Sequence, residues 1–370
     1  MNKIFDINLL GFLIGVFTLS LSFTSLRATS SVGFFEIMLL FLFGIYVLQH
    51  FFLEVNKFEL ATLLPIIFIV IIVAPLTILN FMQGFYGSSI TTLIALIFAS
   101  FAGSLVYTFD SKNRYSFAFG IGLSAFLSIS YIIVSGDLFE TLVRFAFLAN
   151  NPNTLALYSI CSCFLIALIY PKGKIRMLLI FSAIFYGIIS ISDSLFLALF
   201  VGTIFGLISL ITKKGMLLSG IIITLIISFI ILINLELNIF SFFNSLWSEA
   251  DEGGGRIKLL KHGFEAYLQS PVIGHGAGAF SGSYHPFGRF EAHNTYLDLL
   301  TIGGPILMLL FSLPLFLSLP VLYKMEEYLA LTFLIAILVF AFFHFTARHP
   351  IIWTVWGICL SYIYQFKRSV

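Results

Sequence analysis

Apolar residues in this chain form long runs, and short polar stretches separate one run from the next. A helix of about 20 apolar residues is long enough to cross the hydrocarbon core of a membrane, so we predict about 12 membrane spans. They lie at residues 4–26, 33–53, 59–80, 88–109, 115–134, 152–170, 177–190, 195–211, 216–235, 295–322, 328–345 and 350–366. The pattern indicates an all-α polytopic membrane protein, with residues 1–370 in a single integral membrane domain.

One long polar segment, residues 236–294, interrupts this series between the ninth and tenth predicted spans. Within it, apolar residues recur at helical spacing from Ile257 to Leu268, and charged residues take the other positions. This pattern is typical of an amphipathic helix that lies in the membrane interface. Pro271 is expected to end that helix, because proline cannot continue it. The segment is therefore predicted to be one large loop on a single side of the membrane.

The composition supports a membrane protein and excludes some other classes. Hydrophobic residues make up 60% of the chain and charged residues 10%, against roughly 45–50% and 25% in soluble domains. The net charge of +2 is too small to indicate a nucleic-acid partner. Cys161, Cys163 and Cys359 all fall inside apolar runs, so we expect them to pack in the core and not to form disulfides or a thiolate metal site.

Basic residues in the short loops indicate the orientation, since they favour the cytoplasmic side. With a cytoplasmic N-terminus, that side would hold Lys3, Lys57, Lys112, Arg114, Lys172, Lys174, Arg176, Lys213, Lys214, Lys324, Lys367 and Arg368. The short loops on the other side would hold only Arg27, Arg144 and Arg348. This asymmetry predicts that both termini are cytoplasmic and that the loop 236–294 is extracytoplasmic.

The basic residues on the predicted inner side are mostly lysine, whereas the predicted outer side carries Arg27, Arg144, Arg256, Arg289 and Arg348. A guanidinium can hold a phosphate through two parallel hydrogen bonds, which a lysine cannot do. Anchoring in the membrane interface is the alternative role for each of these arginines. Arg256 has a further advantage, because it stands at the start of the predicted amphipathic helix, where free backbone N–H groups favour an anion.

Two polar junctions on the outer side precede predicted helices. Asn151 can cap a helix whose first residue is Pro152. The second junction, residues 190–194, contains Asp193, for which an arginine such as Arg144 or Arg348 is a suitable partner. Helix capping and structural pairing are the simplest roles for these residues.

The end of the outer loop carries the best candidates for chemistry. His293 and Asn294 stand where the loop enters the tenth span, and histidine, with a reference pKa near ~6.5, can accept a proton at physiological pH. Glu291 and Asp298 are close enough in sequence to orient the His293 ring or to serve as the base themselves. A structural interface histidine is the alternative for His293. A zinc site formed by His275, His285 and His293 matches no standard ligand spacing.

The order of these motifs resembles the O-antigen ligase and O-antigen polymerase superfamily. The match consists of Arg256, an amphipathic stretch, the Pro-x-x-Gly-x-Gly run at 271–276, the sequence Ala-His-Asn-Thr-Tyr-Leu at 292–297 and two glycines at 303–304. The resemblance implies a GT-C-like inverting membrane glycosyltransferase that uses an undecaprenyl-diphosphate-linked glycan as donor and needs neither metal nor cofactor. It also implies that Arg256 contacts the diphosphate and that His293 acts at the acceptor hydroxyl.

The predicted site therefore has His293, Glu291 and Asp298 as catalytic residues. The predicted substrate-binding residues are Arg256, Arg289, Arg144, Arg348, Asn294 and His275. The expected partners are the lipid-linked donor, a glycan acceptor, membrane lipid and, as a candidate, a protein that regulates chain length. The resemblance also places the protein in the cytoplasmic (inner) membrane of a bacterium.

One departure from the family pattern bears on the reaction. Ligase-like members often carry Ser-Arg-Gly at the junction that corresponds to residues 192–194, whereas this chain has Ser-Asp-Ser there. Arg144, Arg289 or Arg348 could replace the missing arginine. The departure favours a polymerase, which joins repeat units, over a ligase that transfers the glycan to lipid A-core. A flippase or transporter of lipid-linked oligosaccharide is the second alternative, although the near absence of charges in the middle of the spans weakens it.

Overall fold

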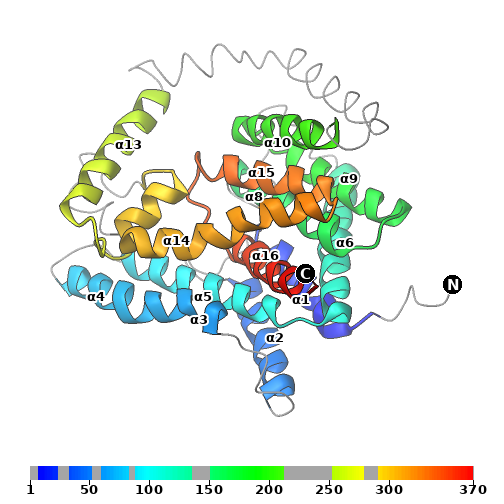
Figure 1. Ribbon diagram of the computed structural model, residues 1–370, viewed down its shortest axis with the longest axis horizontal. Helices are drawn as coiled ribbons and strands as arrows, with labels where there is room; N and C mark the ends of the chain where they lie inside the picture. The colour runs from blue at the N-terminus through cyan, green and yellow to red at the C-terminus, as the bar shows by residue number, and fades with distance from the viewer. Residues whose placement is uncertain are drawn as a thin grey trace.

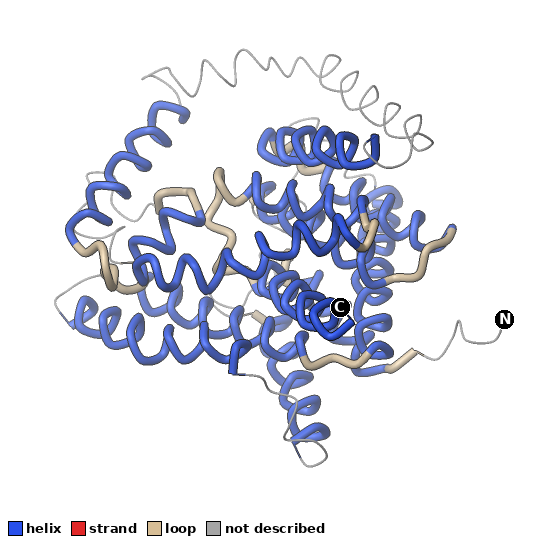
Figure 2. The backbone as a smooth tube through the Cα atoms, in the orientation of Figure 1, coloured by secondary structure: helices blue, strands red, loops and turns tan. Residues whose placement is uncertain are grey.

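The structure is a computed structural model that describes residues 7–23, 33–51, 60–82, 88–135, 151–211, 252–278 and 291–369. In these ranges every regular element is a helix (Figure 2). The helices are α1 (Leu9–Ser20), α2 (Phe34–Phe51), α3 (Leu60–Phe68), η3 (Ile69–Val73), α4 (Ala74–Met82), α5 (Ser88–Tyr107), α6 (Ser111–Ser135), α8 (Pro152–Ile169), α9 (Lys174–Ile188), α10 (Asp193–Ile211), α13 (Glu252–Gln269), α14 (Thr295–Lys324), α15 (Tyr328–Phe340) and α16 (Pro350–Ser369).

Six of the described helical segments are long and apolar enough to cross a membrane. They are Leu60–Leu79, Ile90–Tyr107, Ser111–Val134, Pro152–Ile169, Asp193–Ile211 and Thr295–Lys324. Shorter apolar helices, at Leu9–Ser20, Phe34–Gln49 and Tyr328–Phe340, fall on three of the other predicted spans, and the predicted span 216–235 lies outside the described residues. The protein is thus an all-helical, multi-pass membrane protein in the part of the chain that the structure describes.

The core of the molecule lies around α8 and α16, which the other helices surround (Figure 1). All residues of α8 from Thr154 to Leu168 are buried, as are those of α16 from Ile351 to Leu360. The α5 and α16 backbones meet at a glycine pair, where a Cβ on Gly357 would lie 2.1 Å from the carbonyl oxygen of Gly103. Small residues at such crossings let membrane helices approach closely. The three cysteines are free and buried, so their predicted place in the core is confirmed.

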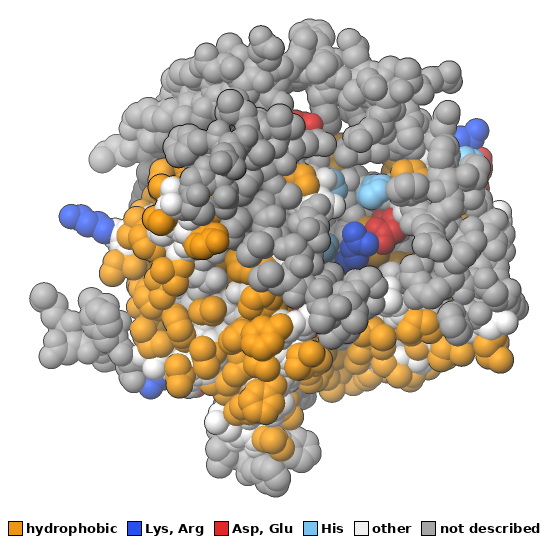
Figure 3. Space-filling view, turned by 180° about the vertical axis from the view of Figure 1, so that it is seen from behind, with side chains coloured by type: hydrophobic (Ala, Val, Ile, Leu, Met, Phe, Trp, Pro, Cys, Tyr) orange, Lys and Arg blue, Asp and Glu red, His pale blue; other side chains and the backbone are white. Residues whose placement is uncertain are grey.

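The outward surface of the bundle is strongly apolar. Figure 3 shows hydrophobic side chains over much of one face, and large exposed ones recur along α2, α3, α4 and α14. Helix α2 projects from the body of the bundle and carries exposed residues such as Phe34, Ile37 and Phe41 (Figure 1). Surface of this kind suits contact with lipid tails and would be a large liability in water.

Two of the helical spans are irregular, and these two spans are in contact with each other. The span that begins at Leu60 contains the five-residue π-helix η3 between α3 and α4. Helix α14 is interrupted at Gly303 and Gly304, which have non-helical dihedral angles and are followed by Pro305. Interruptions within spans are tolerated where neighbouring elements satisfy the backbone groups that they release.

Candidate active site

The turn before α14 is built by a pair of reciprocal helix caps. The Asn294 side chain accepts a hydrogen bond of 3.0 Å from the backbone N–H of Leu297, so Asn294, which stands where the loop enters the tenth predicted span, caps the helix. In return, Asp298 accepts 2.9 Å and 3.1 Å hydrogen bonds from the backbone N–H groups of Ala292 and Asn294. The buried Asp298 carboxylate therefore binds the chain on both sides of His293.

His293 itself is held in an unusual backbone conformation. Its φ is +53°, in the left-handed region that few residues other than glycine adopt. Such conformations persist when the surroundings enforce them, and they are common at functional sites. Here the two hydrogen bonds to Asp298 hold the backbone N–H groups of Ala292 and Asn294, the residues before and after His293. The position of His293 is thus determined by the fold and is only partly exposed.

An arginine from the loop after α15 reaches the same turn. Arg348 donates a hydrogen bond of 2.5 Å from Nη1 to Oε1 of Glu291, although the two residues are 57 positions apart. Their side chains are 38% and 20% exposed, so the pair is partly open to the surroundings. Figure 3 shows a basic and an acidic side chain next to each other on this face, with histidine side chains beside them. Arg144, the other candidate partner for Asp193, lies outside the described residues.

Four helices begin at this end of the bundle, as their cross-contacts show. At the start of α10, Ser192 donates a 2.7 Å hydrogen bond to Oδ1 of Asn153 in the first turn of α8. The ring of Tyr158 in α8 makes an edge contact, with centroids 6.0 Å apart, with His349 just before α16. The backbone N–H of Thr295, the first residue of α14, donates to the carbonyl of Ala341. Helix N-termini carry partial positive charge that favours anions, and the C-terminal ends of α9 and α15, which carry partial negative charge, lie at the same end of the bundle.

A network of hydroxyl and imidazole groups joins these helix ends. Thr295 donates a 2.5 Å hydrogen bond to the carbonyl of His344 and lies 2.9 Å from the hydroxyl of Thr346. The Nε2 atom of His344 is 2.9 Å from the Ser194 hydroxyl, and the His344 ring stacks on Phe340. Our sequence interpretation did not assign these residues to the site. The polar sequence between α15 and α16, which interrupts two apolar runs, is the signal that could have revealed them.

The glycine-rich run after α13 packs against the backbones of two helices. The N–H groups of His275 and Gly276 donate to the carbonyls of Thr301 and Ile302, at the point where α14 is interrupted. On the other side, the N–H of Ala277 donates a 2.8 Å hydrogen bond to the Thr77 hydroxyl in α4. The glycine-rich run, in which Gly274 and Gly276 have φ of +71° and +83°, therefore approaches the backbones of other parts of the protein closely.

Helix α13 packs on the turn that carries His293. Ala266, Ala292 and Leu297 form a small apolar cluster, and a Cβ on Gly263 would come within 2.9 Å of Leu297. Leu260, Phe264 and Leu268 form an exposed apolar stripe on another face of the helix. The predicted amphipathic helix is present, and it ends at Gln269, just before Pro271 as expected. The His275 ring lies 2.7 Å from the carbonyl of Ala266 and links the glycine run to this helix.

Some of the predicted site residues fall outside this description. Arg144, Arg289 and His285 belong to segments that the structure does not describe. Arg256 lies in α13, but its side chain is also outside the described set. Among the described residues there is no group of His, Cys, Asp and Glu that could hold a metal ion. The described part of the candidate site therefore consists of His293, Asn294, Asp298, the Glu291–Arg348 pair and His275, whose ring is bonded to the carbonyl of Ala266.

Residues 177–312 match a family model described as O-antigen ligase. The resemblance drawn from the motifs is confirmed over this range. It runs from α9 into α14 and includes the described turn with His293 and its reciprocal caps. The match supports a function of the O-antigen ligase or polymerase type, with a lipid-linked glycan and an acceptor as substrates. No curated protein matches the chain in sequence.

Proposed function

We propose that the protein is a polysaccharide polymerase, which joins glycan repeat units that are carried on undecaprenyl diphosphate. In this reaction an acceptor hydroxyl oxygen forms a bond to the anomeric carbon of the donor sugar. The bond from that carbon to the diphosphate oxygen breaks, and lipid diphosphate leaves. A base on the protein takes the proton from the hydroxyl. A single displacement of this kind inverts the anomeric configuration.

The observation that carries the proposal is the convergence of His293, Arg348 and four helix N-termini at one end of a lipid-facing bundle. Displacing a diphosphate requires positive charge near the leaving oxygens and a base near the acceptor. Arg348 and the helix N-termini can supply the positive charge. His293 is the best candidate for the base, because the fold fixes its backbone and leaves it partly exposed.

The groups around His293 are assigned supporting roles. Both Asp298 oxygens accept hydrogen bonds from backbone N–H groups, which favours positioning of the turn over proton transfer. Glu291 is bonded to Arg348, which favours orientation of that guanidinium. Arg256, Arg289 and Arg144 remain predicted contacts of the diphosphate, while Asn294 and His275 remain predicted to line the substrate site.

The donor lipid is proposed to lie beside α13. That helix packs on the turn with His293 through one face and exposes Leu260, Phe264 and Leu268 on another. An apolar stripe at the level of the membrane interface suits the first isoprene units of a polyprenyl chain. The diphosphate of a donor placed there would lie close to the start of α14.

Two alternatives make different products. A ligase would transfer the finished glycan to lipid A-core, and a flippase would move lipid-linked oligosaccharide without lengthening it. The Ser-Asp-Ser sequence at 192–194 favours the polymerase, because the arginine typical of ligase-like members is not there. Ser192 and Ser194 instead bond to Asn153 and His344.

Purified protein in proteoliposomes, given undecaprenyl-diphosphate-linked repeat units alone, tests the proposal. We expect products of two or more repeat units on one lipid carrier, and a chain-length regulator added to the liposomes should narrow the distribution. The His293→Ala variant serves as the inactive control. Products that require lipid A-core would identify a ligase, and translocation without lengthening would identify a flippase.

Orientation is tested separately with reporter fusions. We place both termini in the cytoplasm and the loop 236–294 outside the cytoplasmic membrane, on the basis of the lysine-rich short loops. A reporter fused after Lys214 should report a cytoplasmic location, and one inserted near Ser283 an extracytoplasmic one. The reverse result would place the candidate site on the cytoplasmic side and contradict the proposed donor geometry.

A further inference from the structure

A second cluster of arginines lies at the other end of α16. This helix starts at Pro350, beside the candidate active site, and ends at Ser369, so its 20 residues span about 30 Å. At its far end a pocket of about 240 Å³ opens between the last turns of α16, the end of α5 and the start of α6. Arg114 from α6 and Arg368 from α16 both line this pocket.

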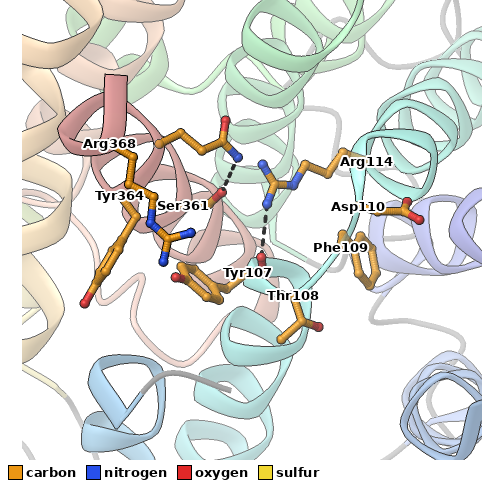
Figure 4. Close-up of a pocket in the computed structure, with 9 residues that line it drawn as sticks. Tyr107, Thr108, Phe109, Asp110, Arg114, Ser361, Tyr364 and Arg368 are labelled. Atoms are coloured by element: carbon orange, nitrogen blue, oxygen red, sulfur yellow. Dashed lines mark hydrogen bonds between the residues drawn. The ribbon is translucent and has the colours of Figure 1, made fainter. Parts of the chain in front are cut away.

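The two guanidinium groups reach the pocket from different helices. Figure 4 shows them extending toward Tyr107 from opposite sides, with Tyr364 on the wall that α16 provides. Gln365 of α16 also lines the pocket. The rings of Tyr107 and Tyr364 make an edge contact with centroids 6.2 Å apart. Tyrosine hydroxyl and glutamine amide groups can donate hydrogen bonds to an anion in addition to the two cations.

Arg114 has unused hydrogen-bonding capacity at this place. Its side chain donates a hydrogen bond of 3.1 Å from Nη2 to the carbonyl of Tyr107. Within the described part of the chain, its Nε atom is buried and has no hydrogen-bond partner. A buried donor without a partner is costly, and the arginine fork has five N–H groups to offer. The guanidinium is therefore suited to an additional acceptor.

The pocket also has a net positive charge. Asp110 is its one acidic lining residue, and the Oδ1 atom of that carboxylate accepts a 2.7 Å hydrogen bond from the backbone N–H of Asn113. Asp110 thus caps the start of α6. Two guanidinium groups against one carboxylate give the lining side chains a charge of about +1, while the start of α6 contributes partial positive charge and the ends of α5 and α16 partial negative charge.

The depth of the pocket in the membrane indicates the class of anion. The candidate spans Ile90–Tyr107 and Ser111–Val134 end and begin at its wall, so it lies at the level where lipid phosphates are found. Basic pockets between membrane helices are typical binding sites for anionic lipid headgroups. The positive-inside rule accounts for basic residues here, but it does not require that they surround a cavity.

We propose that this pocket binds a phosphate group, at the end of the molecule away from the candidate active site. The phosphate is that of an anionic phospholipid headgroup or a free phosphate ion, and both would be held by Arg114 and Arg368. A bound phosphate would join α5, α6 and α16 and so stabilise the folded protein by mass action. The site requires no particular reaction at the other end of the molecule.

Native mass spectrometry of the full-length protein with short-chain phosphatidylglycerol tests the lipid source, and a thermal-shift titration with inorganic phosphate tests the free ion. We expect Arg368→Gln to weaken binding of the anion by about tenfold, because a charge-assisted hydrogen bond is lost. Arg368 is exposed, so this variant should fold. Arg114→Lys, which keeps the charge and loses the fork, should weaken binding as well.

Lys367→Gln and Lys112→Gln are the matched controls, because these neighbouring basic residues do not line the pocket. Binding of phosphatidylglycerol that only the arginine variants weaken supports a lipid headgroup site. A phosphate-dependent rise in melting temperature that only those variants lose supports a site for the free ion. Equal losses in all four variants would mean a diffuse charge effect and would overturn the proposal, as would no binding of either probe.

Discussion

The glycine run at 274–278 and the polar turn at 291–295 flank the same undescribed stretch, yet they have different surroundings. The glycine run is bonded to backbone groups at the interruption of α14 and to Thr77 in α4. The polar turn has its backbone held by the Asp298 carboxylate, and it joins Glu291 to Arg348. The glycine run therefore packs against other parts of the protein. The polar turn instead carries ionisable side chains that are partly exposed.

This difference shows why a glycine-rich motif alone is a poor guide to a ligand site. Backbone can approach a phosphate or another backbone equally closely when no Cβ intervenes. The two regions differ in whether their polar groups are used in hydrogen bonds to the rest of the protein or are left partly exposed as ionisable side chains. We accordingly expect substitutions in the glycine run to affect folding first, and substitutions in the polar turn to affect turnover first.

The largest effect is expected for Gly304→Ala. Gly304 has a φ of +66°, and a Cβ there would lie 2.1 Å from the carbonyl oxygen of Val272. Because that oxygen belongs to the backbone, it cannot easily move out of the way. We expect a loss of more than about 4 kcal/mol in stability, in the range of exceptional single substitutions. Yield of monodisperse protein and its melting temperature measure this.

Gly44→Ala is the matched control for that experiment. Gly44 lies within α2, where an added Cβ would meet nothing within 4 Å. Alanine is favoured over glycine inside a helix by about 1 kcal/mol, so this variant should be as stable as the wild type or more so. A Gly304→Ala protein that melts at the wild-type temperature would show that the close contact between the interruption of α14 and Val272, just before the glycine run, is not needed for packing.

His293→Ala comes next and should act on turnover. General-base catalysis typically supplies about 10²–10⁴-fold, which corresponds to about 2.7–5.5 kcal/mol in the barrier. We expect the polymerisation rate to fall by that factor while the protein keeps its stability and donor binding. His293→Gln can hydrogen-bond but cannot act as a base near neutral pH. A loss as deep as that of alanine would support proton transfer, and substantial rescue would support positioning of the acceptor.

His262→Ala provides the control for the histidine variants. His262 is on the polar side of α13, 3.2 Å from Glu265, and should be replaceable without loss of activity. If His293→Ala polymerises at the wild-type rate, the residue is an interface histidine, and Glu291 or Asp298 becomes the better candidate for the base.

Much of the helical framework could be predicted because a membrane span has a length and composition that a sequence displays directly. The helix caps at Asn151 and Asn294 are also indicated by the sequence, since an asparagine directly before an apolar run is a typical N-cap residue. The interruption of α14 was not predicted. Its two glycines resemble ordinary span glycines until the neighbouring backbone of Val272 is known.

The site could be predicted only in its local part. His293, Asn294 and Asp298 lie within six positions, so helix geometry brings them together. The Arg348–Glu291 bond and the contact of His344 with Ser194 join residues 57 and 150 positions apart, which no local pattern encodes. The role of Asp298 was also hard to foresee. In the sequence, an acidic residue near a histidine is as good a candidate for the base as the histidine. The structure shows that the Asp298 carboxylate oxygens accept hydrogen bonds from backbone N–H groups.

Asp298→Asn should have an intermediate effect, with a loss of both stability and turnover. An asparagine has one carbonyl oxygen and one amide nitrogen, so only one of the two backbone N–H groups would still find an acceptor. A buried donor left without a partner costs about 1–3 kcal/mol. We expect the melting temperature and activity to fall together. A large loss of activity at unchanged stability would instead indicate that Asp298 transfers a proton. Glu265→Gln, on the exposed face of α13, is the control.

The smallest effects are expected at the Glu291–Arg348 pair, where two substitutions separate orientation from chemistry. Arg348→Lys keeps the charge but loses the planar fork, so kcat/KM for the lipid-linked donor should fall by about tenfold if the guanidinium holds the diphosphate.

Glu291→Gln retains an oxygen that can accept the hydrogen bond from Arg348, and it changes little in shape. We therefore expect less than about a threefold change for this variant, because positioning of Arg348 would persist. A general base could not be replaced in this way, since glutamine takes no proton near neutral pH and the rate would drop by about 10²–10⁴-fold. Steady-state kinetics of the two variants thus decide whether the carboxylate orients the arginine or takes the proton from the acceptor.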